Sequence, residues 1–170
     1  YGLSPRMRFD LAINGMVLGL FKNKKIPVMR DGDQWRPFIH VKDTAKAFIM
    51  AMESPEKKVN RETFNVGSNE QNCQILPLAE MIGKALPISF NIEWYGSPDK
   101  RSYRVSFDKI RRVLGFRLDY TPKEGALEVY EALESGKVTD SLETKTVEWY
   151  KHLLSMYATV KDIAIRDTIL

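Results

Sequence analysis

The segment from Asp31 to Asp43 constrains the fold most, because a turn, a strand and a helix start follow one another within it. Asp31-Gly32 is typical of hairpin turns, since glycine accepts the positive φ that such turns need. The next residues, 35–41, alternate as a β-strand does, and Pro37 favours an edge position because proline cannot donate to a ladder. Asp43 stands where a helix N-cap belongs. The segment predicts a strand passing directly into a helix.

Arg36 lies where this turn meets this strand. A guanidinium held at such a point can bind a phosphate or pyrophosphate through two parallel N–H bonds. Arg36 is therefore a candidate anion-binding residue.

The remaining hydrophobic patterns and turn residues predict an α/β chain. We expect helices over residues 7–23, 43–52, 74–86, 107–114, 121–133 and 140–156, and strands over residues 26–29, 35–41, 62–66 and 89–94. Strand 26–29 is expected to pair with strand 35–41. Gly15 and Gly19 in the first helix indicate close packing against a neighbouring element rather than a membrane dimer motif, which needs a longer apolar span.

Five short motifs, in order along residues 1–135, resemble the extended short-chain dehydrogenase/reductase family of NAD-dependent nucleotide-sugar epimerases and dehydratases. The signature Arg36-Pro37-Phe38-Ile39-His40-Val41-x-Asp43 is accompanied by Tyr1-Gly2-x-Ser4-Pro5, the helix 9–17, Phe64-Asn65-Val66-Gly67, and Ser106-Phe107-Asp108-Lys109-Ile110 with Leu114-Gly115-Phe116.

The resemblance implies the C-terminal part of a Rossmann-like extended fold, without the glycine-rich N-terminal half. Residues 1–136 would form its substrate-binding half, and residues 137–170 a C-terminal helical extension. In this family, residues 62–66 would be a parallel strand of the nucleotide-binding sheet. We expect the chain to pair with a missing N-terminal half or to form a homo-oligomer, because an unpaired apolar strand is prone to association.

By the same resemblance, Arg36, Arg101 and Asn14 would bind the diphosphate of a nucleotide-sugar. Two arginines from different segments are a physical means of clamping a dianion. Many family members carry the second arginine shortly before the aspartate that matches Asp99, whereas this chain has Gly96 and Ser97 there. Arg101 takes that role in our interpretation, with Arg104 as the alternative. Asn14 could equally be a structural residue whose side chain is hydrogen-bonded within the protein.

The cofactor-binding and catalytic motifs of the family do not occur in the matched region. None of the ten glycines forms a GxGxxG loop, which would place a pyrophosphate on a helix N-terminus. Tyr157 and Lys161 form a Tyr-x-x-x-Lys pair, but it follows the last family element instead of preceding the first, so we interpret it as coincidental. We therefore assign no catalytic residue and leave cofactor-binding residues unknown. NAD or NADP is expected to bind the complete enzyme and not this chain alone.

Other chemistry is sparse. The two histidines, His40 and His152, have no partner at metal-ligand spacing, so no metal site is expected; His40 is interpreted as a packed, hydrogen-bonded residue. The net charge of +4 is too small to indicate a nucleic-acid binder. No apolar run is long enough to span a membrane. A single cysteine, Cys73, fits a reducing cytoplasm.

The sequence thus predicts the nucleotide-sugar-binding portion of an NAD-dependent epimerase/dehydratase, inactive without the cofactor half. Whether the chain by itself counts as an enzyme stays open. The alternative is a non-catalytic interaction or regulatory module derived from such an enzyme.

Overall fold

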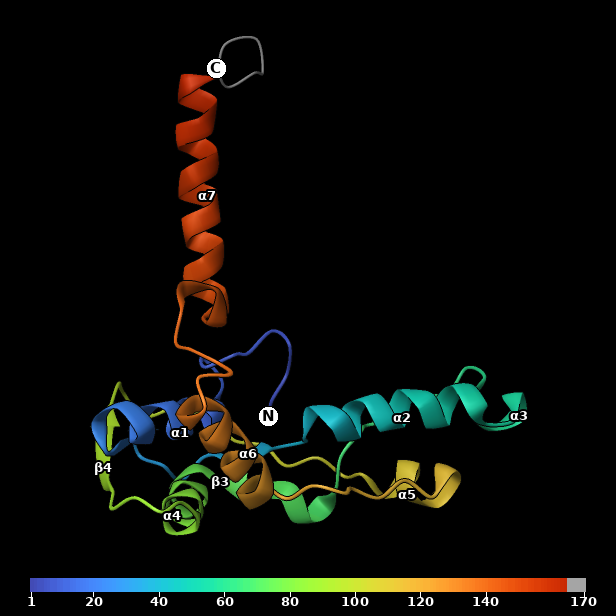
Figure 1. The fold of residues 1–170 in the computed structure, drawn as a ribbon. Helices are drawn as coiled ribbons and strands as arrows, with labels where there is room; N and C mark the ends of the chain where they lie inside the picture. Colours follow the sequence, from blue (N-terminus) through green and yellow to red (C-terminus); the bar gives the residue numbers. More distant parts are fainter. Residues whose placement is uncertain (165–170) are drawn as a thin grey trace.

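The structure of the chain is a computed structural model that describes residues 1–164. Its α/β architecture has a body, an arm and a projecting C-terminal helix (Figure 1). The elements, in chain order, are α1 (Ala12–Asn23), β1 (Lys25–Met29), β2 (Trp35–Pro37), α2 (Val41–Glu53), α3 (Glu56–Val59), η1 (Asn69–Gln71), β3 (Asn72–Gln74), α4 (Ile75–Ala85), β4 (Asn91–Tyr95), α5 (Asp108–Leu114), α6 (Pro122–Glu134), η2 (Leu142–Thr144) and α7 (Thr146–Ile163).

The body is built on two two-stranded sheets and three helices. β1 pairs with β4 in parallel, and β2 pairs with β3 antiparallel. α1 packs against β1, α4 and α6, so its apolar face is buried. A Cβ on Gly19 would lie 2.6 Å from Pro27 Cδ. This confirms that the glycines of α1 serve close packing.

The predicted pairing of strand 26–29 with strand 35–41 is wrong. β1 takes β4 as its partner, with Ile26 opposite Ile92, and β2 covers only residues 35–37. Local patterns locate a strand but carry no information about a partner more than 60 residues away. Strand 89–94 is confirmed as β4, shifted by two residues at its start.

Residues 62–66 form no strand in the described chain, contrary to the prediction. A parallel strand needs a neighbouring strand to pair with. Within residues 1–164, no strand pairs with residues 62–66. Phe64 and Val66 instead pack into a second, smaller core with Ala47 of α2, Phe107 and Ile110. This core forms the arm, in which α2 lies above α5 (Figure 1).

The predicted N-cap at Asp43 is also wrong by one turn. α2 begins at Val41, and its N-cap is His40, whose side chain accepts the backbone N–H of Lys42. Asp43 lies in the first turn and is fully buried. Its two carboxylate oxygens accept the backbone N–H groups of Asp119 and Tyr120, at 2.9 and 3.2 Å. Asp43 therefore ties α2 to the segment before α6.

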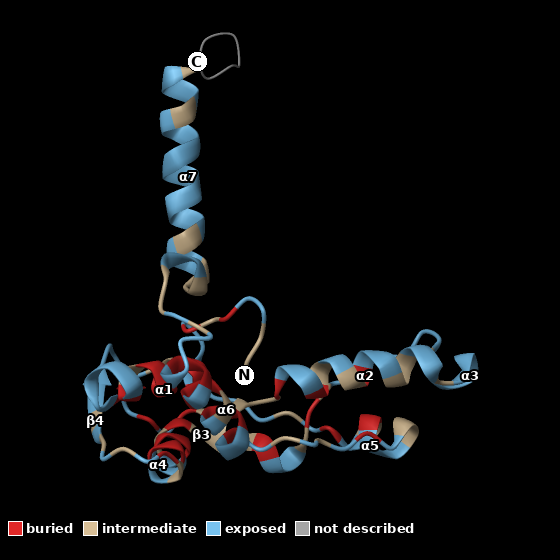
Figure 2. Cartoon of the chain, viewed as in Figure 1, coloured by how far each residue is buried: buried red, intermediate tan, exposed pale blue. Residues whose placement is uncertain are grey.

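Helix ends with recognisable capping residues agree with prediction. Gly115 ends α5 in the left-handed region, with φ of 71°. Thr121 caps α6 through a capping box with Glu124. α7 has no buried residue and stands away from the body, and most of its residues are exposed (Figure 2). The division of the chain at residue 136 stays a prediction, and Ile165, Ile169 and Leu170 lie outside the described residues.

Candidate functional site

Arg36 is the middle residue of β2, and its guanidinium is held by three acceptors. Nη1 donates to the carbonyl oxygen of Trp35 at 2.8 Å and to that of Arg101. Nη2 donates to Asp99 Oδ2 at 2.9 Å. The guanidinium also lies 5.2 Å from the ring centroid of Tyr103. These contacts fix both the position and the plane of the Arg36 side chain.

Arg101 binds the same carboxylate from the other side. Its Nε donates to Asp99 Oδ1 at 2.9 Å and its Nη2 to Oδ2 at 3.0 Å. The backbone N–H of Arg101 also donates to Oδ1, at 3.0 Å. These hydrogen bonds, with the charge of Arg36, lower the pKa of Asp99 to about 2. The structure thus brings the two predicted clamp arginines together around one carboxylate.

The cavity beside this cluster lies between α1, β1 and the end of β4 and has a volume of about 380 Å³. Pockets for small ligands typically have volumes in this range and above. Its lining combines aromatic and aliphatic side chains with a few polar groups: Phe9, Asp10, Leu11, Ala12, Gly15, Met16, Pro27, Met29, Gln34, Arg36, Ile75, Tyr95 and Asp99. Arg36 and Asp99 therefore form a charged edge on a hollow of mixed lining, in which Asp10 is a further carboxylate.

Arg104, the alternative second arginine, lies elsewhere. Its guanidinium stacks over the ring of Trp35, 4.9 Å from the centroid. It lines a separate hollow with Asn69 and Asn72 and makes no ion pair with Asp99. Of the two candidates, Arg101 is the one that joins Arg36.

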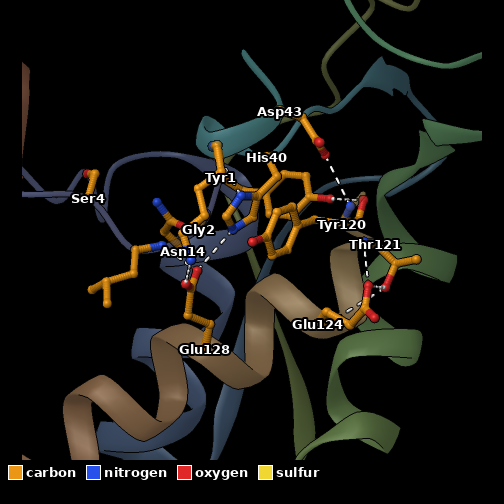
Figure 3. Close-up of polar contacts among 12 residues, drawn as sticks. Tyr1, Gly2, Ser4, Asn14, His40, Asp43, Tyr120, Thr121, Glu124 and Glu128 are labelled. Carbon is orange, nitrogen blue, oxygen red and sulfur yellow. Dashed lines mark hydrogen bonds and ion pairs between the residues drawn. The ribbon is translucent and has the colours of Figure 1, made fainter. Parts of the chain in front are cut away.

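Asn14 does not line this cavity; Figure 3 shows it beside Gly2 and Glu128. The side chain is buried, and Oδ1 accepts the backbone N–H of Gly2 at 3.1 Å. Its Nδ2 donates to the carbonyl oxygen of Arg8 at 3.2 Å. Both ends of the amide are thus satisfied by the loop that precedes α1, which is the structural role that the sequence left open.

A buried polar cluster around His40 fastens α2 to α6 (Figure 3). The His40 side chain is 0% exposed; Nδ1 accepts from the Lys42 backbone, so Nε2 carries the proton and donates to Glu128 Oε2 at 2.9 Å. The imidazole stacks on Tyr120 at 4.2 Å between centroids. Burial lowers the pKa of His40, against the opposing effect of Glu128. The prediction that His40 is packed and hydrogen-bonded is confirmed.

The sequence did not identify Glu128 as part of this cluster. A glutamate in an amphipathic helix is usually solvent-exposed, and the local pattern carries no information about partners in other elements. Besides His40, its carboxylate accepts the backbone N–H of Leu3 at 3.0 Å and the ammonium of Lys42. Burial opposes ionisation of Glu128, but these hydrogen bonds hold its pKa below the usual value. The cluster is fully paired, which suits a structural role.

A larger hollow, of about 520 Å³, lies between residues 67–71 and 116–122. Its lining includes Arg111, Arg117 and the aromatic residues Phe107, Phe116 and Tyr120. Neither Arg36 nor Arg101 reaches it. Size alone therefore does not mark the candidate site; the convergence of charged groups at the smaller cavity does.

Three further expectations concern features outside the cavity. The part of the chain that the structure describes contains no group of three or more His, Cys, Asp or Glu side chains able to hold a metal ion. Tyr157, of the Tyr157–Lys161 pair, is 66% exposed on α7 and lines neither the cavity beside Arg36 nor the 520 Å³ hollow. Among the helices of residues 1–164, none has the length and apolar character needed to cross a membrane.

Comparisons with known proteins agree with the arrangement of the chain. The sequence model described as "NAD dependent epimerase/dehydratase family" matches residues 2–67. UDP-D-apiose/UDP-D-xylose synthase 2 of Arabidopsis thaliana is 32% identical over 91 residues, which is 47% of this chain and 23% of the relative. dTDP-glucose 4,6-dehydratase 1 of Escherichia coli (strain K12) is 27% identical over 165 residues, covering 91% of this chain and 40% of the relative.

Solved structures show the same fold. UDP-glucuronic acid 4-epimerase from Bacillus cereus, in complex with UDP-glucuronic acid and NAD, superposes with a TM-score of 0.65 at 23% identity, over 79% of this chain and 42% of the other. dTDP-glucose 4,6-dehydratase from Bacillus anthracis, in complex with NAD, gives a TM-score of 0.65 at 24% identity, over 81% and 42%. The chain spans less than half the length of these relatives. Residues 2–67 therefore resemble the NAD-dependent epimerase/dehydratase family, and the chain shares the Rossmann-like α/β fold of these solved structures.

Proposed function

We propose that this chain is the nucleotide-sugar-binding portion of an NAD-dependent epimerase/dehydratase. One observation carries the proposal: Arg36 and Arg101, which lie in different segments, converge on Asp99 at the edge of a 380 Å³ cavity. Arg36 lines this hollow and Arg101 reaches it through Asp99, and aromatic and aliphatic side chains lie beside them; this combination suits a ligand with a diphosphate at one point and a nucleoside beside it. UDP-glucuronic acid, bound by the Bacillus cereus relative, has this composition.

The residues of the chain would bind and orient this ligand. Arg36 is pre-positioned by two carbonyl oxygens and the Tyr103 ring, so it can meet a phosphate oxygen with little loss of side-chain entropy. The apolar lining would exclude water around the nucleoside. Asn14 would contribute indirectly, by holding the loop before α1, which forms one wall of the cavity.

NAD or NADP would supply hydride transfer in the complete enzyme. Residues 1–164 contribute a binding surface but no glycine-rich loop and no Tyr-x-x-x-Lys pair near the cavity. We expect no turnover by the chain alone and no NAD binding by it. A partner half or a second copy of the chain, in the cytoplasm, would complete the working protein.

The test is isothermal titration of the chain with UDP-glucuronic acid. Replacing Arg36 with Ala should weaken binding about tenfold or more, as expected for loss of a charged hydrogen bond. Arg112→Ala is the matched control, because Arg112 is exposed on α5 and does not line the cavity. Equal affinity of the Arg36→Ala variant and the unmodified chain would remove Arg36 from the site and the proposal with it.

A second candidate, a non-catalytic interaction module, is favoured by α2. Phe48 and Met52 on its outer face are 68% and 77% exposed, and Figure 2 shows this helix largely uncovered. Contiguous exposed apolar side chains mark interaction surfaces. Stable self-association without any affinity for UDP-glucuronic acid, measured by native mass spectrometry and titration, would support this candidate over the first.

A further inference from the structure

We propose that Asp99 is an internal counter-ion, which occupies the guanidinium of Arg101 until an anionic ligand displaces it. The inference rests on the proposed function and adds to it a regulation of ligand affinity. It makes Asp99 a competitor of the ligand and Arg101 the mobile half of the clamp.

The carboxylate of Asp99 is saturated by the two arginines. Oδ1 accepts two N–H groups of Arg101, from its backbone and its Nε. Oδ2 accepts one N–H from Arg36 Nη2 and one from Arg101 Nη2. A carboxylate has about four acceptor sites, and all four of these sites on Asp99 are used. Asp99 therefore takes the N–H donors of the two arginines that a phosphate group would otherwise accept from.

The two arginines differ in how they depend on Asp99. Arg36 keeps the Trp35 and Arg101 carbonyl oxygens and the Tyr103 ring when Asp99 is removed, and its side chain is only 20% exposed. The Arg101 side chain is 82% exposed, and its hydrogen bonds within residues 1–164 go to Asp99 alone. Arg101 is therefore the guanidinium that can swing from the carboxylate to a ligand.

Charge sets the direction of the effect. Two guanidinium groups and one carboxylate leave a net charge of one positive unit on the cluster, and the carboxylate repels an incoming anion. The low pKa of Asp99, about 2, keeps it charged at any physiological pH. Release of Arg101 therefore needs a competing anion rather than a proton, and removal of the Asp99 charge should strengthen anion binding.

The experiment measures binding of inorganic pyrophosphate and of UDP to the full chain, at low and at moderate salt. Asp99→Asn keeps the shape of the side chain and removes its charge. The variant should bind both probes at least about threefold more tightly, with a steeper loss of affinity on adding salt. Asp162→Asn is the control, because it changes the net charge equally on α7, away from the cavity. Arg101→Ala in the Asp99→Asn background should abolish the gain.

The outcomes separate this inference from the proposed function. If the unmodified chain binds UDP and Asp99→Asn binds it equally or more weakly, Asp99 is not a competitor, while the binding function stands. If only Asp99→Asn binds, the counter-ion blocks the site as inferred. If neither binds, both are overturned, provided that circular dichroism shows both chains folded. A similar gain with Asp162→Asn would reduce the effect to overall charge and overturn the inference.

Discussion

Replacing Asp43 with Ala should destabilise the chain severely, although the residue lies outside the cavity. Asp43 is 0% exposed and accepts two backbone N–H groups, from Asp119 and Tyr120. Alanine would remove the acceptor of both N–H groups, which are partly buried. Each unsatisfied group costs about 1–3 kcal/mol, so the expected loss is about 2–6 kcal/mol, a large share of the 5–15 kcal/mol by which domains are typically stable.

Urea unfolding followed by circular dichroism measures this loss. Asp119→Ala is the control, because the Asp119 side chain is 59% exposed and forms only a surface pair with Lys46; it should change the free energy of unfolding by less than about 1 kcal/mol. A loss below about 1 kcal/mol for Asp43→Ala would show that the two N–H groups find water. The interpretation of Asp43 as the tie between α2 and the segment before α6 would then be wrong.

Two further predictions concern the body and the arm. Burial lowers the pKa of His40, so the unfolded chain binds more protons than the folded chain once the pH falls below about 6.5. The free energy of unfolding should therefore decrease on acidification from there through the folded pKa of His40, and it should decrease less in the His40→Gln variant. Urea unfolding at a series of pH values measures this, and a gain in stability on acidification would contradict it. Gly19→Ala would bring a Cβ to 2.6 Å from Pro27 Cδ and 2.8 Å from the Lys25 carbonyl oxygen. The free energy of unfolding should fall by about 1–3 kcal/mol, measured by thermal unfolding. An unchanged melting temperature would mean that α1 can move away from β1.

The sequence predicted what depends on neighbouring residues. Gly115 at the end of α5 and the Thr121 capping box at the start of α6 agree with the structure because both are decided within one helical turn. The α/β class follows from the same local patterns together with the family resemblance. α1 was predicted about five residues too long at its start, because the apolar residues Met7 and Phe9 belong to a loop that packs on the core.

What the sequence missed depends on distant residues. β1 pairs with β4 instead of the strand that follows it, and Asp43 serves Asp119 instead of capping its own helix. Glu128 acquires its partners from His40 and Leu3, more than 80 residues away. The convergence of Arg36 and Arg101 was expected only through the resemblance, and the part of Asp99 in it was visible only in the structure.

The most direct measurement of the central claim is NMR of the Arg36 and Arg101 side-chain Nε–H groups during titration with UDP-glucuronic acid. The account predicts that both signals shift together and saturate with a single dissociation constant, and that uridine, which has no phosphate, leaves them unchanged. If both signals stay in place while backbone signals elsewhere respond, for example along the larger hollow at residues 116–122, the ligand binds outside the arginine pair and the proposed site is wrong.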